Sequence, residues 1–230
     1  MLNNLKFAAV AMMLTAAPAA AELEISLYTG VQNAESSTDS VRLPGSATTV
    51  KRDITWKAKP LSNPFYYGGR ATWWTDKNIG FGIEGTHTKA VASPADRAAL
   101  GVDKLEFTDG HNIITANIMK RWPGAFVKAP KFTPYVGAGL GIAVPHVDIK
   151  VTGASGRTFG YETTGPAVRG IAGVKYNINE KWALFGEYQI VYSDNDATID
   201  ADPAVAGQTD GKLKTELLTQ AINVGFSYSF

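Results

Sequence analysis

Cysteine is absent from this chain of 230 residues, and histidine occurs only three times. The absence of cysteine excludes disulfides and thiolate metal sites, so a stable fold must hold itself by a packed core or by closing its sheet. Excess charge is also missing, because 22 Lys and Arg stand against 21 Asp and Glu. This balance argues against a nucleic-acid partner, which a strongly basic surface would favour.

Long apolar runs are lacking except near the N-terminus. That segment has one cation, Lys6, an apolar stretch over residues 7–17 and a run of small residues that ends at Ala21. This is the layout of a secretory signal peptide, and we predict cleavage after Ala21. The alternative, a membrane-anchoring helix, would need about 20 apolar residues. The predicted organisation is a signal peptide over residues 1–21 and one mature domain over residues 22–230.

Alternation with a period of two dominates the mature chain. In residues 217–230, Ile222, Val224 and Phe226 occupy alternate positions, with small or polar residues between them. An apolar face toward lipid and a polar face toward an interior is the pattern of a transmembrane β-strand. Seven further segments show the same pattern, each near the roughly 9 to 11 residues that a tilted membrane strand needs. They are residues 22–32, 65–74, 79–87, 111–122, 134–144, 167–178 and 182–192.

The predicted fold class is therefore all-β: an eight-stranded antiparallel up-and-down transmembrane β-barrel of the OmpA and OmpX type in the outer membrane. The main alternative is a soluble lipocalin-like barrel, which also has eight strands but points its apolar residues inward. Charged residues at mid-strand decide between the two, because all six lie opposite the apolar face. They are Glu24, Arg70, Glu84, Arg169, Lys175 and Glu187. We expect them to pair inside a narrow, filled barrel; a proton or ion path is the alternative.

Connection lengths predict the orientation. Short links at 76–78, 123–131 and 177–181 alternate with longer, polar links at 33–64, 91–109, 151–160 and 198–212. Barrels of this kind keep short turns in the periplasm and long loops outside, so both termini should be periplasmic. The terminal Phe230 resembles the signal by which the barrel-assembly machinery recognises its clients. We expect a monomer.

The three histidines map to the predicted extracellular ends of successive strands, with acidic residues nearby. Imidazole and carboxylate groups together suit a divalent transition metal. However, His87 and His146 continue the lipid-facing phase, whereas His111 continues the interior phase. A bulge at Pro145 would reset that phase; otherwise these are unrelated histidines at the barrel rim.

Polar residues that face outward at this rim would contact the phosphorylated glucosamine headgroups of lipid A. They include His87, Lys89, His146, Lys150 and Arg157. The chain has no nucleophile-elbow motif, no zinc-protease motif and no phosphate-binding loop.

Five phrases of the sequence, taken together, resemble the outer-membrane lipid A oxidases of rhizobia and their relatives. The phrases are FGIEGTHTKA, LEFTDGHNIITANIMKRW, PYVGAGLGIAVPHVDI, TFGYETTGPAVRGIAGV and LFGEYQIVYSDNDATID. The similarity covers most of the mature chain. It implies an oxygen-dependent oxidation of the proximal glucosamine of lipid A to 2-aminogluconate at the outer membrane, although no catalytic motif maps residue by residue.

Two functional hypotheses follow. The first is a lipid A oxidase with its site at the outer rim. Its candidate cofactor is a divalent metal, and its partner is lipid A or lipopolysaccharide. Its candidate catalytic residues are Glu106, Asp109, Asp148 and Glu162, and its candidate metal ligands are His111 and His146. The second is a non-enzymatic outer-membrane barrel that contributes to envelope integrity or adhesion through its extracellular loops.

Overall fold

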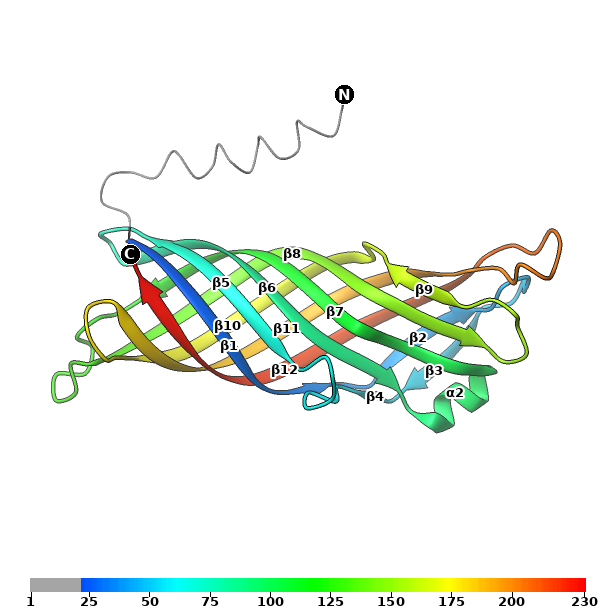
Figure 1. Ribbon diagram of the computed structural model, residues 1–230, viewed down its shortest axis with the longest axis horizontal. Coiled ribbons are helices and arrows are strands. Elements are labelled where there is room, and N and C mark those ends of the chain that lie inside the picture. Colours follow the sequence, from blue (N-terminus) through cyan, green and yellow to red (C-terminus); the bar gives the residue numbers. More distant parts are fainter. Residues whose placement is uncertain (1–21) are drawn as a thin grey trace, which may run out of the picture.

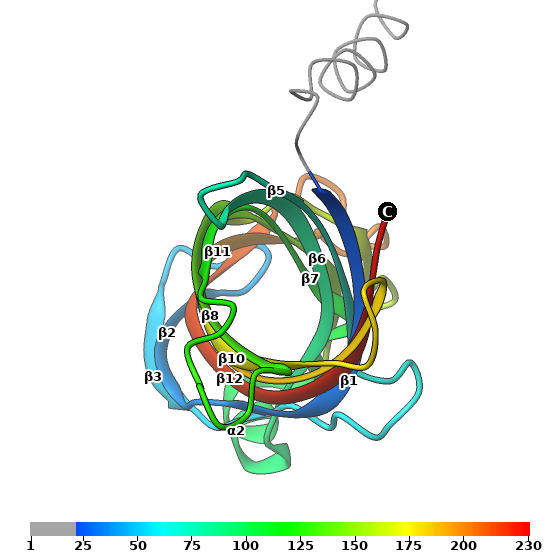
Figure 2. The same cartoon turned by 90° about the vertical axis from the view of Figure 1, so that its left-hand side faces the viewer.

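The computed structural model describes residues 22–230, so the predicted signal peptide lies outside the described residues. Eight long strands run antiparallel to their neighbours along one tilted wall (Figure 1). They are β1 (Glu22–Ala34), β5 (Tyr67–Trp74), β6 (Ile79–Ala92), β7 (Val102–Arg121), β8 (Phe132–Val151), β10 (Gly165–Asn177), β11 (Trp182–Ile199) and β12 (Gly211–Ser229). The last strand pairs with the first, with Leu27 opposite Phe226, which closes the ring (Figure 2). The predicted eight-stranded antiparallel barrel is confirmed.

Both described chain ends lie at one end of the barrel, since Glu24 pairs with Ser229. We call this the terminal end and the opposite one the far end. Three turns join strands at the terminal end: residues 75–78, 122–131 and 178–181. The assignment of the terminal end to the periplasm remains a prediction.

The half of the barrel nearer the terminal end has an apolar outside and a polar inside, as predicted. On β12, Ile222 and Val224 are 63% and 61% exposed, while Asn223 between them is fully buried. Leu140 on β8 is 70% exposed. Exposed aliphatic side chains in a continuous ring are stable only against lipid, so this half is the membrane-spanning part. The soluble alternative, with its apolar residues inside, does not describe it.

The far half has the opposite polarity without any change of phase. On β12, Leu213 and Leu217 point inward and are fully buried, and the alternate residues at 212, 214 and 216 are charged and face outward. A core of apolar residues fills this half, including Trp56, whose ring stacks on Phe107 at 5.9 Å. Because water surrounds the wall here, the apolar face turns to the interior, as in a soluble barrel. The strands therefore extend well beyond the membrane.

Segments that the sequence pattern assigned to long loops contribute to this far half. The 33–64 segment contains β2 (Ser37–Arg42), β3 (Val50–Ile54) and β4 (Trp56–Lys57), and the 151–160 segment contains most of β9 (Thr158–Tyr161). β2 pairs with β12 and β4 with β6, so these short strands continue the wall where β1 and β5 end. The four long links were expected to be loops, and two of them contain short strands, which carry too few alternations to be recognised from the sequence.

The 91–109 segment contains the short helix α2 (Pro94–Leu100). The Ser93 hydroxyl caps its first turn by accepting from the Asp96 amide at 3.2 Å, and Gly101 ends it in the left-handed conformation at φ 70°. Capping of this kind satisfies amides that the helix itself leaves without partners. Within residues 22–230, no helix has the length and apolar character needed to cross a membrane.

A bulge in β7 separates the two halves on one side of the barrel. Phe107 lies opposite Val147 and His111 opposite Pro145, so β7 uses two more residues than β8 over the same step. Gly110 takes a positive φ of 108° in the bulge, a conformation that side chains rarely adopt. The irregularity therefore lies opposite Pro145 and, because two residues are added, the phase does not reset.

Candidate functional site

Eight residues gather on the outer face of the far half, where β7, β8 and β9 lie side by side. This rim cluster consists of Lys104, Glu106, Asp109, His146, Asp148, Arg157, Phe159 and Tyr161. Its position follows from register: β9 pairs with β8 so that His146 lies opposite Tyr161 and Asp148 opposite Phe159. The cluster lies directly beyond the lipid-facing surface of the same strands.

Asp148 is the most enclosed group of the rim cluster. Its side chain is fully buried although it points outward, because Arg157 and Lys104 cover it. Arg157 binds both carboxylate oxygens, through Nε at 2.6 Å and Nη2 at 2.5 Å, and Lys104 reaches it at 3.1 Å. Lys104 also contacts Glu106 at 3.2 Å. Two cations thus neutralise two carboxylates, an arrangement that positions Arg157 rigidly.

His146 forms the second part of the rim cluster. Its Nδ1 atom lies 3.6 Å from the Asp109 carboxylate, and its ring meets the rings of Phe159 and Tyr161 edge to face at 4.3 and 4.7 Å. The two aromatic side chains are 54% and 64% exposed, and the Arg157 guanidinium lies over the Phe159 ring at 4.3 Å. An imidazole beside a carboxylate can accept a proton and have its charge stabilised, and such pairs tighten when substrate binds.

His111 lies on the other side of the wall. Its ring is buried in the interior, stacked on Phe107 at 5.4 Å, and Nε2 lies 3.2 Å from both Asn195 Oδ1 and Ser193 Oγ. His111 and His146 therefore face opposite sides of the barrel wall and do not bind one ion jointly. Among residues 22–230, no three His, Asp or Glu side chains are placed to hold a metal ion.

Glu162 is bonded away from the rim cluster. Its carboxylate accepts from the backbone amide and the hydroxyl of Thr198 on β11, both at 2.9 Å. Of the six candidate residues, the structure brings together Glu106, Asp109, His146 and Asp148 and separates His111 and Glu162 from them. Sequence reasoning missed Lys104, Phe159 and Tyr161, although the alternation of Phe159 and Tyr161 would have indicated β9.

A second histidine faces outward on the neighbouring strands. The His87 ring stacks on Tyr67 at 5.0 Å, and its Nδ1 atom lies 3.0 Å from Asn112 Oδ1. This places it on the lipid side of the wall, as its phase predicted. It shares no contact with the acids of the rim cluster, since its partners are an aromatic ring and an amide.

The membrane-spanning interior holds the expected pairs of opposite charge. Arg70 Nη2 lies 2.6 Å from Glu187 Oε2, Arg169 Nη1 lies 2.5 Å from Glu84 Oε1, and Lys175 pairs with Glu24. Two interior cavities lie beside this network, each of about 10 Å³. Space of that size holds little more than a single water, so among the described residues the network serves as packing and not as an open path.

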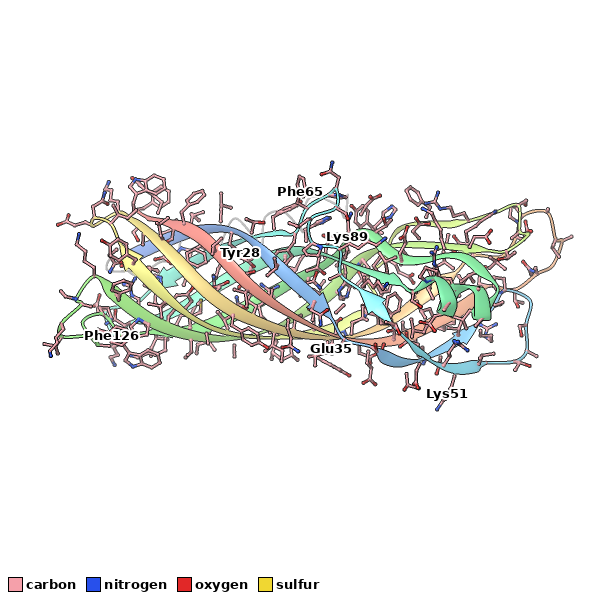
Figure 3. All side chains as sticks on the ribbon, turned by 90° about the horizontal axis from the view of Figure 1, so that it is seen from below. Tyr28, Glu35, Lys51, Phe65, Lys89 and Phe126 are labelled. Carbon is pink, nitrogen blue, oxygen red and sulfur yellow. The ribbon has the colours of Figure 1, made fainter. Side chains whose placement is uncertain are left out.

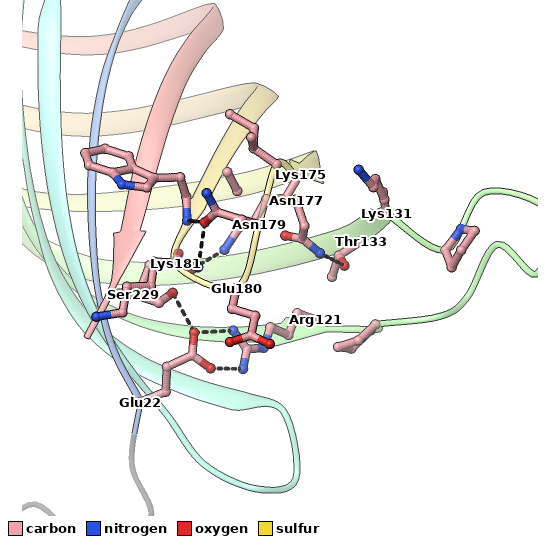
Figure 4. Close-up of a pocket in the computed structure, with 16 residues that line it drawn as sticks. Glu22, Arg121, Lys131, Thr133, Lys175, Asn177, Asn179, Glu180, Lys181 and Ser229 are labelled. Carbon is pink, nitrogen blue, oxygen red and sulfur yellow. Dashed lines mark hydrogen bonds and ion pairs between the residues drawn. The ribbon is translucent and has the colours of Figure 1, made fainter.

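The mouth at the terminal end forms a larger pocket of about 510 Å³ (Figure 4). Arg121 binds the Glu22 carboxylate there at 2.6 Å, and Ser229 donates to the same carboxylate at 2.7 Å. Lys175 in the same pocket pairs with Glu24. These two ion pairs therefore join β1 to β7 and to β10 across the mouth of the barrel.

The closed ring, the lipid-facing surface and the paired interior charges define a transmembrane β-barrel protein. Comparison by sequence then gives its family: the chain belongs to the outer membrane protein beta-barrel domain family, whose model matches residues 7–230. None of the curated proteins matches this chain.

Two crystal structures have similar folds. Neisserial surface protein A (NspA) is 14% identical with a TM-score of 0.50, covering 91% of this chain and 97% of its own. The outer membrane protein OprG from Pseudomonas aeruginosa is 12% identical with a TM-score of 0.51, covering 92% of this chain and 96% of its own. At these identities the similarity establishes the shared fold only.

Proposed function

We propose that this outer-membrane barrel acts on the lipid A headgroup through the rim cluster and oxidises its proximal glucosamine. In this proposal the terminal end faces the periplasm and the far end the exterior. The rim cluster would then stand beside the outer leaflet, where lipid A presents phosphorylated sugars. The choice of oxidation as the reaction rests on the sequence resemblance to the rhizobial enzymes.

The observation that carries the proposal is the arrangement around His146. The Tyr161 ring is 64% exposed and offers a face on which a sugar ring could pack, as apolar sugar faces do on aromatic side chains. Arg157 lies over the Phe159 ring at 4.3 Å and provides a fixed cation for a phosphate. His146 and Asp109 supply a base between the two.

The substrate is a proximal glucosamine whose anomeric carbon carries a hydroxyl and no phosphate, and the overall reaction converts this lactol carbon to a carboxylate. The lactol, dioxygen and water give the aldonic acid and hydrogen peroxide, so the carbon loses two electrons and dioxygen gains them. His146 would take the proton from the anomeric hydroxyl, and the Asp109 carboxylate would stabilise the imidazolium that forms. The two candidate metal ligands, His111 and His146, face opposite sides of the wall, and among residues 22–230 no three His, Asp or Glu side chains are placed to hold a metal ion. The residues present therefore do not fit a bound divalent metal, and no step is assigned to one.

The test is mass spectrometry of lipid A from cells with and without the gene. A gain of one oxygen on the proximal sugar, lost in the His146→Ala and Asp109→Asn variants, would support the proposal. His87→Gln is the matched control, because that histidine also faces outward but has no carboxylate partner. Identical spectra with and without the gene would exclude the oxidase.

A second candidate is a non-enzymatic barrel that supports envelope integrity or adhesion. It is favoured by the pairing of Asp148 and Glu106 with Lys104 and Arg157, which explains those carboxylates as structural ion pairs. In either case we propose that the chain is monomeric and inserts with the help of the barrel-assembly machinery through the exposed Phe230. A Phe230 deletion that inserts as efficiently as the intact chain would exclude that role.

A further inference from the structure

We infer that the loop between β4 and β5, residues 58–66, is a lateral lipid-binding loop. Its apolar tip would insert into the leaflet around the membrane-spanning half of the barrel, at the edge of that half nearest the far half. The inference does not depend on any activity at the rim cluster. It rests on the exposure of the tip, on the contacts that hold the loop in place and on its continuity with the lipid-facing surface.

The tip consists of Leu61 and Phe65, which are 77% and 56% exposed. Leu61 is among the most exposed large apolar residues outside the strands. Figure 3 shows Phe65 projecting from the outside of the wall at mid-length of the barrel, away from both ends. An exposed apolar pair at this position is unfavourable in water and favourable at a lipid surface.

The loop is fastened to the wall on both sides of its tip. Lys89 on β6 donates from Nζ to the carbonyl oxygens of Ser62, at 3.2 Å, and Asn63. On the other side, Tyr66 is buried in the barrel, and its carbonyl accepts from the Thr29 hydroxyl at 2.7 Å. The apolar tip therefore stands out from a fixed base, because its neighbours on both sides are held.

Continuity with the membrane surface identifies the occupant as lipid. Tyr67 follows the loop directly, faces outward and is 56% exposed, and its partner in β1 is Thr29, two residues before the lipid-facing Val31. Lys57 and Lys59 are exposed on the far-end side of the tip. An apolar tip with cations on the side toward the headgroups is the arrangement of interfacial membrane anchors.

Because the chain has no cysteine, single-cysteine labelling can measure the depth of the tip. The Leu61→Cys and Phe65→Cys variants would carry an environment-sensitive fluorophore in nanodiscs of phosphatidylcholine and phosphatidylglycerol with depth-graded quencher lipids. We expect blue-shifted emission and strongest quenching about 5–10 Å below the headgroups. Leu140→Cys, in the lipid-facing belt, and Val205→Cys, in the far-end loop between β11 and β12, give the two reference environments.

Lys89→Met tests the fastening of the loop in the same assay. We expect this variant to reduce lipid quenching at the tip, whereas Lys51→Met on β3 should leave it unchanged. Quenching at both tip positions by aqueous iodide to the extent seen at Val205 would overturn the inference. So would efficient disulfide formation by the Phe65→Cys variant when the reduced protein is first diluted into excess lipid and only then oxidised, because a second copy would then be the occupant.

Discussion

Arg70 is the residue on which the interior pairing depends most. Its guanidinium lies between Glu187, at 2.6 Å, and Glu84, at 3.8 Å, and all three are buried. The Arg70→Leu variant would leave Glu187 without its cation, which typically costs about 3–5 kcal/mol in a buried site. We therefore expect a lower urea midpoint in detergent. Lys120→Leu, at a half-buried lysine on β7 that lies outside the network, is the control. An unchanged midpoint for Arg70→Leu would remove Arg70 from the network.

Asp39 on β2 gives a pH dependence to the far half. Burial raises its pKa to about 6, and the Ser37 hydroxyl and the Trp56 indole donate to its carboxylate at 2.7 and 3.1 Å. A raised pKa means that the folded state holds the proton more tightly than the unfolded chain. The resulting stability is complete below the unfolded value near 4 and is lost as pH rises through 6.

The Asp39→Asn variant should therefore be more stable than the parent at pH 7 and should lose the change in unfolding midpoint between pH 4 and pH 7. Urea titrations across this range measure both effects. Asp76→Asn makes the same change in net charge at an exposed position in the 75–78 turn, at the other end of the barrel, and serves as the control. If the parent and Asp39→Asn keep the same pH profile, the buried Asp39 does not titrate in this window.

The alternation of inward and outward positions along the strands shows how much of the candidate site the sequence could reveal. Phase alone placed His87 and His146 outside and His111 inside, and the structure agrees. Phase could not show that Asp109 reaches His146, because that contact depends on the bulge in β7. Contacts between strands depend on register, which alternation within one strand does not determine.

At the scale of elements, the bulge of β7 is held by Gly110. A Cβ atom at this position would lie 2.3 Å from His87 Nδ1 and 2.5 Å from Asn112 Oδ1, and its φ of 108° is strained for other residues. We expect Gly110→Ala to lower the thermal midpoint and to displace Asp109 from His146. Gly85→Ala on β6, where an added Cβ meets nothing within 4 Å, is the matched control. Equal midpoints for the two variants would contradict a requirement for glycine in the bulge.

The eight membrane strands were predictable because each carries several alternations of apolar and polar residues. The far-half elements were not, since β9 has only four residues and β4 two. The sequence pattern also missed the far ends of β7 and β8, for another reason. There the inward residues are apolar, such as Phe107 and Val147, and the outward ones charged, which is the reverse of the membrane pattern. When the apolar residues change from the outer to the inner face within one strand, the sequence pattern is interpreted as the end of that strand.

At the scale of the whole molecule, two kinds of stabilisation meet in one continuous wall. Near the terminal end, lipid solvates the outside and ion pairs fill the interior. Beyond the membrane, water solvates the outside and an apolar core fills the interior. The apolar core stabilises the far half by the hydrophobic effect, which requires no lipid. The far half should thus remain ordered outside a detergent micelle and show slow amide exchange there.

The two halves should consequently respond differently to the loss of a leucine. Leu217 is fully buried in the far core, whereas Leu140 is 70% exposed to lipid. Leu217→Ala leaves a cavity among close-packed neighbours and should lower the free energy of unfolding by about 2–5 kcal/mol. Leu140→Ala leaves no cavity, because lipid chains fill the space, and should cost clearly less. Urea unfolding of both variants in the same lipid measures the difference, and comparable losses would mean that the far half lacks a core of its own.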